Sequence, residues 1–265
     1  MIPCYNEATR LDVGAFLDFT RAYPALRLLL VDDGSTDGTA AVLESLWSHS
    51  PESFEVLRLP RNRGKAEAVR LGIRAALRDL PRYVGFWDAD LATPLEALLD
   101  FYRVLEERPW IELAVGSRVQ LLGRDIARHR SRHYLGRVFA TITSLVLDLR
   151  VYDTQCGAKI FRVTEDTAEL FREPFRARWI FDVELFARLV RLRRTAGRPP
   201  VERIVYEVAL ASWRDVAGSR LRKRDFLTAV LDLARIYRWL RLAHVPAAPL
   251  AASTGSEDGA GGIRD

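Results

Sequence analysis

The sequence contains few groups that bind soft metals, and it has no long apolar run. It has two cysteines, Cys4 and Cys156, and neither lies at a spacing typical of a metal site. The four histidines also lack a metal-ligand context, so we expect no zinc centre. Without a secretory signal, both thiols are expected to be reduced in a cytosolic setting. The chain has no run of the roughly 20 apolar residues that a membrane-spanning helix needs, so no such helix is expected.

Lysine is also scarce, because 37 of the 40 basic residues are arginines. A GC-rich genome produces this bias through codon usage, so the abundance of arginine alone says little. The net charge of +5 nevertheless favours an anionic partner, such as nucleic acid, a phosphorylated substrate or a lipid surface. With 265 residues, 49% of them hydrophobic, the chain is large enough for one sizeable α/β domain or two small ones.

The first 118 residues alternate between apolar runs and helical periodicity. The runs predict buried strands at 27–33, 54–60, 83–90 and 112–118, and the periodicity predicts helices at 8–22, 38–48, 65–79 and 94–108. Thr93 is expected to cap the last helix, with Pro94 in its first turn. This alternation predicts βαβ units, and hence an α/β fold with a mostly parallel sheet flanked by helices. Ligands of such sheets bind beyond the carboxyl ends of the strands.

The second half is expected to form one domain with the first. An arginine-rich stretch at 124–137 precedes an apolar one at 138–149, and a strand is predicted at 158–163, a helix at 179–192, a strand at 201–210 and a basic helix at 224–243. The apolar face predicted for the last helix consists of Phe226, Val230, Leu233, Tyr237 and Leu240. We expect a single domain at 1–243, with a nucleotide-sugar half at 1–118 and an acceptor and membrane half at 119–243. Residues 246–265 are expected to be disordered.

Five short motifs follow the predicted strands in order. They are PCYNE (3–7), VDDGSTDGT (31–39), NRGKAEAVRLGI (62–73), DADLATP (88–94) and GSR (116–118). Together they resemble family 2 glycosyltransferases, whose fold is the nucleotide-sugar-binding glycosyltransferase A type. Three further segments resemble dolichyl-phosphate β-glucosyltransferases and, more loosely, dolichyl-phosphate mannose synthases: DTQCGAKIF (153–161), RWIFDVEL (178–185) and WRDVAGSRL (213–221).

Asp88 and Asp90 stand one residue apart at a predicted strand end, where two carboxylates repel each other unless a cation lies beside them. The resemblance implies that this cation is Mg²⁺ or Mn²⁺, which takes carboxylates together with phosphate oxygens and water. We expect Asp90 to be the protein ligand and Asp88 to face the ribose or a metal-bound water. Mannose synthases of this type have glutamine as a further ligand where this chain has Ala92, which fits the glucosyltransferase branch better.

The resemblance also implies roles for other residues. The residues expected to bind the nucleotide sugar are Pro3, Tyr5, Glu7, Asp33, Lys65, Asp88, Ala89, Arg214 and Arg220. Arg118 and Arg130 are expected at the acceptor phosphate, because a guanidinium binds phosphate with two parallel hydrogen bonds. Asp33 has a helix-capping alternative, and Lys65 has the alternative of a solvated lysine.

Asp90, Asp153 and Asp182 form the expected catalytic set. Asp153, Asp182 and Glu184 are placed on the acceptor side by analogy, and the alternative for the Asp182 and Glu184 pair is a structural role. A phosphate monoester acceptor has a second pKa near ~6, so its oxygen is already an anion at neutral pH. We therefore expect Asp153 and Asp182 to orient groups, not to remove a proton. Cys156 is interpreted as a small packing residue.

The segment from Arg118 to Arg137 holds six arginines and one acid, Asp125. A basic segment beside an apolar one predicts contact with an anionic membrane surface and a lipid phosphate. The alternative is a solvated basic face over a core helix. Nucleic acid is not expected, since no recognition module is present. The expected location is the cytoplasmic, inner face of the membrane, with the chain bound peripherally.

The predicted function is inverting transfer of a hexose, most simply glucose from UDP-glucose, to a polyprenyl phosphate of the dolichyl type. The alternatives are transfer from GDP-mannose, and a membrane-associated nucleotide-binding module without turnover. A haloacid-dehalogenase-type phosphatase also begins its motif Asp-x-Asp, but it requires Thr or Val at the position of Ala92. Only Met1 and Ile2 precede Pro3, where about five strand residues are typical, so we expect the natural chain to start further upstream.

Overall fold

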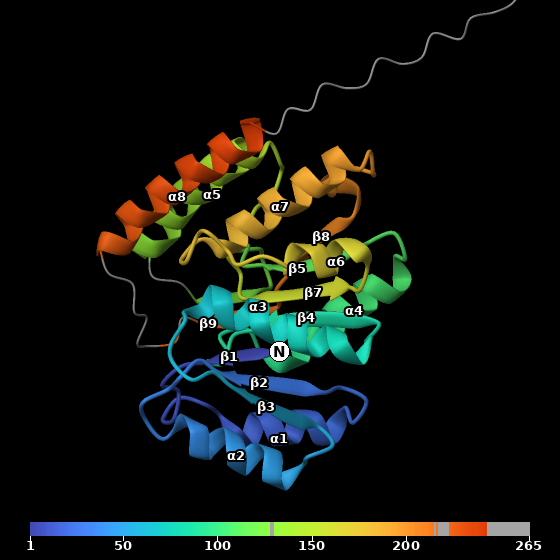
Figure 1. Ribbon diagram of the computed structural model, residues 1–265, viewed down its shortest axis with the longest axis vertical. Coiled ribbons are helices and arrows are strands. Elements are labelled where there is room, and N and C mark those ends of the chain that lie inside the picture. The colour runs from blue at the N-terminus through green and yellow to red at the C-terminus, as the bar shows by residue number, and fades with distance from the viewer. Residues whose placement is uncertain (128–129, 215, 217–222, 243–265) are drawn as a thin grey trace, which may run out of the picture.

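The computed structural model describes residues 1–127, 130–214, 216 and 223–242 (Figure 1). Its first half consists of parallel strands and helices in alternation. Strands β1 (Ile2–Cys4), β2 (Leu28–Asp32) and β3 (Phe54–Arg58) pair in that order, all parallel. Helices α1 (Val13–Ala22) and α2 (Thr39–His49) separate them, and α3 (Lys65–Ala76), which a 3₁₀ turn η1 (Leu77–Asp79) extends, follows β3. The predicted βαβ arrangement is confirmed.

The second half of the sheet has one strand running against the others. Strands β4 (Tyr83–Trp87), β7 (Ala158–Arg162), β5 (Leu113–Ser117) and β8 (Val205–Ala209) lie in this order. β7 is antiparallel to both of its neighbours, whereas β5 and β8 are parallel. The sheet is therefore mixed, and the sequence did not predict the direction of β7.

The two parts of the sheet meet at the first residue of the chain. The amino group of Met1 donates to the carbonyl of Gly85 at 2.7 Å, and the N–H of Trp87 donates to the carbonyl of Met1 at 3.0 Å. β1 thus lies beside β4, and the strands follow one another as β3-β2-β1-β4-β7-β5-β8 (Figure 1). The carboxyl ends of β1, β2, β4 and β5 consequently face one edge of one sheet, as the prediction of a ligand site requires.

Burial explains why the strand predictions were accurate at the centre of the sheet. Every residue of β2 and of β5 is buried, because helices cover both faces there. α4 (Leu98–Glu107) follows a 3₁₀ turn, η2 (Leu95–Ala97), so the predicted helix begins one turn later than expected. Pro94 is the residue before this turn, and the Thr93 carbonyl accepts the indole N–H of Trp87 at 2.8 Å. The prediction of Thr93 as a helix cap was wrong.

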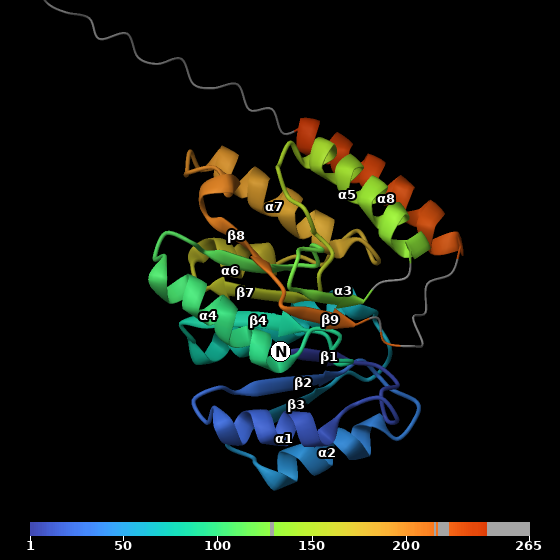
Figure 2. The same ribbon diagram turned by 180° about the vertical axis from the view of Figure 1, so that it is seen from behind.

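Four helices lie over the second half of the sheet. They are α5 (Arg130–Leu147), α6 (Glu165–Leu170), α7 (Phe181–Thr195) and α8 (Lys223–Leu242). α5 and α8 lie side by side in an outer layer next to α7 (Figures 1 and 2). In the part of the chain that the structure describes, no helix is both long and apolar enough to cross a membrane.

The packed face of α8 differs from the predicted one. Ala229, Leu233, Ile236 and Leu240 are buried, whereas Val230 is 51% exposed and Tyr237 is 42% exposed. Apolar side chains occur almost all round this helix, so periodicity alone did not distinguish the packed face from the exposed one. The predicted face was wrong for Val230 and Tyr237, correct for Leu233 and Leu240, and the side chain of Phe226 lies outside the described residues.

Two short strands form a ribbon that the sequence did not predict. β6 (Asp125–Ala127) pairs in parallel with β9 (Ser212–Arg214), and the N–H of Arg214 donates to the carbonyl of Ala92 at 3.1 Å. The ribbon therefore contacts the turn that carries Asp88 and Asp90. The predicted strand at 201–210 starts only at Val205, because the residues after Pro200 form a 3₁₀ turn, η3 (Val201–Arg203).

Candidate active site

Asp88 and Asp90 lie in a tight turn at the carboxyl end of β4. The Asp90 side chain accepts the N–H of Ala92 at 3.1 Å, and Leu91 between them has a left-handed backbone with φ +49°. Ala89 is buried, so the two aspartates stand on either side of a packed residue. Burial and the neighbouring charge of Asp88 raise the pKa of Asp90 above its usual value.

The side chain of Asp88 lies directly against Gly157, which precedes β7. A Cβ at position 157 would be 1.9 Å from the Oδ2 of Asp88, far inside any contact distance. Cys156 packs in the same way against Gly116, whose Cβ would be 2.6 Å from the thiol sulfur. Burial raises the pKa of the Cys156 thiol to about 11, which supports its interpretation as a packing residue.

A basic side chain contacts each aspartate. The Nζ of Lys65 is 2.5 Å from the Oδ1 of Asp88, and the Nη2 of Arg10 is 3.4 Å from the Oδ2 of Asp90. Burial lowers the pKa of Lys65, but the carboxylates of Asp88, Asp182 and Asp90 outweigh this and raise it. Arg10 also pairs with Glu7 at 3.3 Å. No motif in the sequence indicated a role for Arg10, which lies 80 residues from Asp90 along the chain.

The two carboxylates fit a hard divalent cation. Among the described residues no three His, Cys, Asp or Glu side chains are grouped to hold a metal, and this turn carries two carboxylates. Mg²⁺ and Mn²⁺ characteristically take one or two carboxylates and complete their shell with substrate phosphate and water. Because Gly157 has no side chain, the Asp88 carboxylate has room to lie against its backbone. Asp88 and Asp90 are the residues that would hold such an ion.

The loops after β1 and β2 are bonded to each other and to the start of α3. The N–H of Asn6 donates to the Ser35 hydroxyl at 3.0 Å, and the N–H of Glu7 donates to the Thr39 hydroxyl at 2.7 Å. Asp33 is buried and accepts the N–H groups of Arg63 and Gly64 at 2.7 and 2.8 Å. These bonds hold the loop before α3, but no described side chain caps the first turn of α2 or α3, so the capping alternative for Asp33 was wrong, and its contact with a nucleobase remains a prediction.

Pro3 and Tyr5 lie at the carboxyl end of β1, beside these loops. They are partly buried, as is Glu7, and they occupy the same edge of the sheet as the Asp88 turn. The structure thus brings the predicted nucleotide residues of the first half together at one edge.

Arg118 follows β5 and is held by Asp153. Its Nε and Nη2 donate to the two oxygens of this carboxylate at 2.6 and 2.7 Å, the fork geometry that arginine forms with an oxyanion. Its guanidinium also lies over the ring of Trp213, 5.3 Å from the centroid. Burial lowers the pKa of Arg118, but the charge and hydrogen bonds of Asp153 outweigh this and raise the pKa above its usual value, so the side chain is charged. Asp153 is therefore paired with a cation.

Asp182 at the start of α7 has a buried partner too. The Nζ of Lys159, a fully buried residue of β7, is 2.5 Å from its Oδ1 and donates to the carbonyl of Cys156 at 2.7 Å. Glu184 accepts the N–H groups of Arg176 and Ala177, at 2.8 and 2.7 Å, and these contacts support its structural alternative. The sequence alone did not indicate a role for Lys159, because its partner Asp182 is on another element.

Replacing Asp182 by asparagine is expected to lower the free energy of unfolding by about 3–5 kcal/mol, because it leaves the Lys159 ammonium buried without a counter-charge. Chemical denaturation of the purified chain measures this. Asp79→Asn is the matched control, since Asp79 is 63% exposed and its pair with Arg27 is solvated. A loss at Asp182 no larger than the control's would contradict the buried-pair interpretation.

Three predicted residues are not placed in this group. The side chain of Arg214 is exposed and pairs with Asp125 at 3.3 Å, so only its backbone contacts the Asp88 turn. Arg130 begins α5, but its side chain lies outside the described residues, as do Arg220 and the predicted tail at 246–265. Their roles stay predictions.

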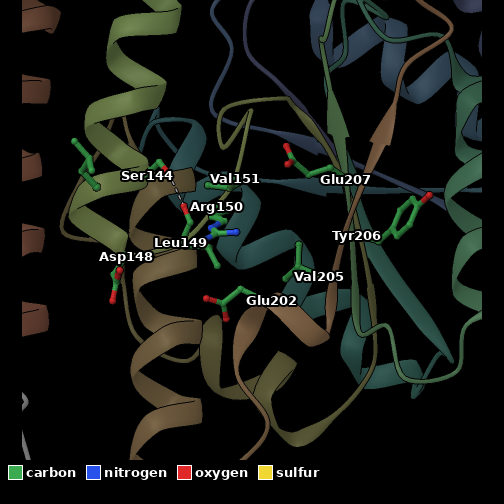
Figure 3. A pocket seen from close by; sticks show the side chains of 10 residues that line it. Ser144, Asp148, Leu149, Arg150, Val151, Glu202, Val205, Tyr206 and Glu207 are labelled. Atoms are coloured by element: carbon green, nitrogen blue, oxygen red, sulfur yellow. Dashed lines mark hydrogen bonds between the residues drawn. The ribbon is translucent and has the colours of Figure 1, made fainter.

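A separate cavity of about 720 Å³ lies between the end of α5 and β8 (Figure 3). Ser144 and Asp148 line it on one side, and Tyr206 and Glu207 of β8 on the other, while Glu202 of η3 projects into it. None of its lining residues belongs to the Asp88 turn. The sequence gave no indication of this cavity.

The mixed sheet, with its carboxylate turn at the end of β4, defines a glycosyltransferase A fold, and solved structures agree. A mannosyltransferase from Pyrobaculum calidifontis, solved with GDP-Man and Mn²⁺, superposes with a TM-score of 0.57 at 17% identity over 94% of this chain and 64% of that one. Glucosyl-3-phosphoglycerate synthase from Mycobacterium tuberculosis, solved with Mn²⁺ and UDP-glucose, gives a TM-score of 0.54 at 18% identity over 93% and 79%.

Residues 1–166 match the sequence profile of Glycosyl transferase family 2, and the chain belongs to this family. The dolichyl-phosphate beta-glucosyltransferase of Drosophila melanogaster is 34% identical over 83% of this chain and 68% of its own length. The enzyme of that name from Dictyostelium discoideum is 32% identical over 91% and 74%. The resemblance inferred from the motifs is confirmed.

Proposed function

We propose that the chain transfers a hexose, most simply glucose from UDP-glucose, to a polyprenyl phosphate with inversion at the sugar. The arrangement that carries this proposal is the pair of Asp88 and Asp90 at one sheet edge with Arg118, which is oriented by Asp153. The two aspartates would bind the diphosphate of the donor through a divalent cation, and Arg118 would bind the phosphate of the acceptor. The names of the similar eukaryotic enzymes support glucose and a dolichyl-type acceptor.

On the donor side, Asp88 and Asp90 would hold Mg²⁺ or Mn²⁺, which would neutralise the charge that develops on the leaving diphosphate. Lys65 and Arg10 stand beside these carboxylates and bring further positive charge to the same place. Asp33, Tyr5, Glu7 and the loops bonded to them would bind the nucleoside.

On the acceptor side, an oxygen of the lipid phosphate attacks the anomeric carbon while the bond from that carbon to the diphosphate breaks. No proton needs to be removed, because the phosphate oxygen is already an anion at neutral pH. Asp153 pairs with Arg118 at 2.6 Å, and Asp182 pairs with Lys159 at 2.5 Å. A carboxylate in such an ion pair is well placed to orient its partner but poorly placed to accept a proton from the acceptor. Arg118 keeps unused N–H donors for the phosphate.

We expect Lys65→Met to bind Mn²⁺ more tightly than the wild type in the absence of nucleotide, and to bind UDP in the presence of Mn²⁺ more weakly. The Lys65 ammonium and the metal ion compete for the Asp88 carboxylate. Removing the ammonium should therefore tighten Mn²⁺ binding by up to about fivefold, which is the scale of a partly exposed ion pair. Electron paramagnetic resonance of Mn²⁺ and calorimetry with UDP measure the two affinities.

Arg27→Met, which breaks the solvated pair with Asp79, is the control for Lys65→Met. If both affinities of the Lys65 variant fell together, the idea of competition at Asp88 would be wrong.

We also propose that the outer layer formed by α5 and α8 rests on an anionic membrane surface, at the cytoplasmic, inner face. Six apolar side chains of these helices are 42–73% exposed: Val138, Ile142, Leu145, Val230, Leu231 and Tyr237. Exposed arginines Arg235, Arg238 and Arg241 accompany them on α8. Apolar side chains beside arginines suit the boundary between lipid headgroups and acyl chains. Of the arginines predicted to contribute, Arg128 and the side chains of Arg130 and Arg132 lie outside the described residues.

The triple variant Ile142→Ser, Leu145→Ser, Leu231→Ser is expected to reduce binding to anionic vesicles by more than about tenfold, because each side chain would lose its burial in the acyl boundary. Vesicle co-sedimentation measures this. Trp110→Ser removes an apolar side chain that is 61% exposed between α4 and β5, and it should leave binding unchanged. If the triple variant and Trp110→Ser reduced vesicle binding equally, the outer layer would not be the membrane-binding surface.

A panel of nucleotide sugars tested with one short polyprenyl phosphate examines the proposal directly. Glucose from UDP-glucose is the expected product, in β-linkage to the lipid phosphate. Transfer from GDP-mannose alone would establish the mannosyltransferase alternative. Binding of nucleotide sugar without any transfer would favour the nucleotide-binding module.

A further inference from the structure

Glu207 holds the loop that carries Asp153. It lies on β8, beside Val115 of β5, and its two carboxylate oxygens accept the N–H of Tyr152 at 3.0 and 2.9 Å. Its Oε1 also accepts the N–H of Asp153 at 3.0 Å. A carboxylate that accepts two successive backbone N–H groups fixes both the position and the direction of that loop.

Asp153 passes this constraint on to Arg118. Besides the two side-chain bonds, the Oδ2 of Asp153 accepts the backbone N–H of Arg118 at 3.2 Å, and its Oδ1 accepts the N–H of Gln155 at 3.2 Å. Asp153 is buried, and the side chain of Arg118 is only 16% exposed. Since the guanidinium is a rigid fork, the direction of its free donors follows from the position of the Asp153 carboxylate.

We propose that Glu207 is a positioning residue for the acceptor phosphate, acting through Asp153 on Arg118. This inference rests on the proposed function, because it takes Arg118 to bind that phosphate. Glu207 itself lines the cavity between α5 and β8, and its carboxylate holds the loop at Tyr152 and Asp153. Its effect on transfer should therefore appear in the use of the acceptor and not in the binding of the donor.

The decisive change is Glu207→Gln, which keeps the size of the side chain but removes its negative charge and puts an NH₂ group in place of one of the two oxygens that accept the loop N–H groups. The KM for polyprenyl phosphate is expected to rise about tenfold, the scale of a lost charge-assisted hydrogen bond, with a smaller change in kcat. The affinity for UDP with Mn²⁺, measured by calorimetry, should stay at the wild-type value. Glu202→Gln is the matched control, because Glu202 lines the same cavity and lies on η3, before β8.

A double-mutant cycle separates positioning from general damage. If Glu207 acts through Arg118, adding Glu207→Gln to Arg118→Lys should raise the acceptor KM by less than about twofold further, since coupled residues are not additive. Multiplied effects, an equal loss of UDP affinity, or an unchanged KM would each overturn the inference. Should Glu207→Gln fail to fold by circular dichroism, Glu207→Asp, which keeps both oxygens, replaces it in the cycle.

Binding of a short isoprenyl phosphate, followed by calorimetry on the same variants, needs no turnover. About tenfold weaker binding by Glu207→Gln than by wild type and Glu202→Gln supports the inference even if the sugar donor proves to be another one. A wild-type chain that neither binds nor uses a lipid phosphate would overturn the proposed function and this inference together. A wild-type chain that binds it as tightly as Glu207→Gln would overturn this inference alone.

Discussion

Gly157→Ala is expected to abolish sugar transfer while the chain remains folded. The added methyl group would stand 1.9 Å from the Oδ2 of Asp88, so the aspartate side chain must leave its place. The ion pair with Lys65 at 2.5 Å would be lost with it. Losing one of the two carboxylates proposed to hold the metal would remove charge stabilisation of the leaving group, for which losses of about a hundredfold or more in kcat are typical.

Transfer rates and thermal unfolding of Gly157→Ala, measured side by side, check this prediction. Gly136→Ala in α5 is the matched control, because a Cβ there meets nothing within 4 Å and alanine favours a helix. Activity of the Gly157 variant within about threefold of the control would mean that Asp88 has room elsewhere or has no part in the reaction.

Asp90→Asn is the second change with a large expected effect. The amide keeps the hydrogen bond from Ala92 at 3.1 Å but removes the charge that would hold the divalent ion. The rate at saturating donor should fall below about a tenth of wild type, and much of the loss should persist at high Mn²⁺ concentration. A variant that keeps more than this tenth would contradict the assignment of the metal to Asp90.

The ranking of aspartate variants across pH 6–8 extends the test, since phosphate acceptors ionise near ~6. Asp153→Asn, compared at equal folded fraction, should cost clearly less than Asp90→Asn, because we expect Asp153 to orient Arg118 and to take no proton. Asp100→Asn in α4, whose carboxylate is exposed and pairs with Arg103, serves as the control for the substitution itself. If a folded Asp153 variant that still binds donor proved as inactive as Asp90→Asn, a true base would be at work.

The sequence predicted those parts of the fold whose signal is local. β2 and β5 are buried on both faces, so their apolar runs were plain, and the motifs at the strand ends resembled the correct family. The direction of β7 was not predictable in this way, because it depends on which neighbours a strand finds. The β6–β9 ribbon pairs segments more than 80 residues apart through three residues each, too short for a pattern.

The site residues also divide into those with a local signal in the sequence and those without one. Asp88 and Asp90 were predicted because their motif stands in order with four others that together resemble the family, whereas two carboxylates at a strand end are common on their own. Gly157, Lys159 and Glu207 were not, since each matters through a partner that is distant along the chain: Asp88, Asp182 and the loop at Asp153 respectively. Such residues are recognised only when their contacts are seen.

We propose, then, that this chain moves glucose from UDP-glucose to a lipid phosphate with the help of a divalent ion held by Asp88 and Asp90. To test this, the purified chain is incubated with UDP-glucose labelled in the glucose, a short polyprenyl phosphate and Mn²⁺. The label that is extracted with the lipid is then measured. We expect a single lipid product, β-linked glucosyl polyprenyl phosphate, which is absent with chelator and absent with Asp90→Asn. Label that reaches the lipid equally well with chelator, or no lipid product from wild type with any nucleotide sugar, would contradict this proposal.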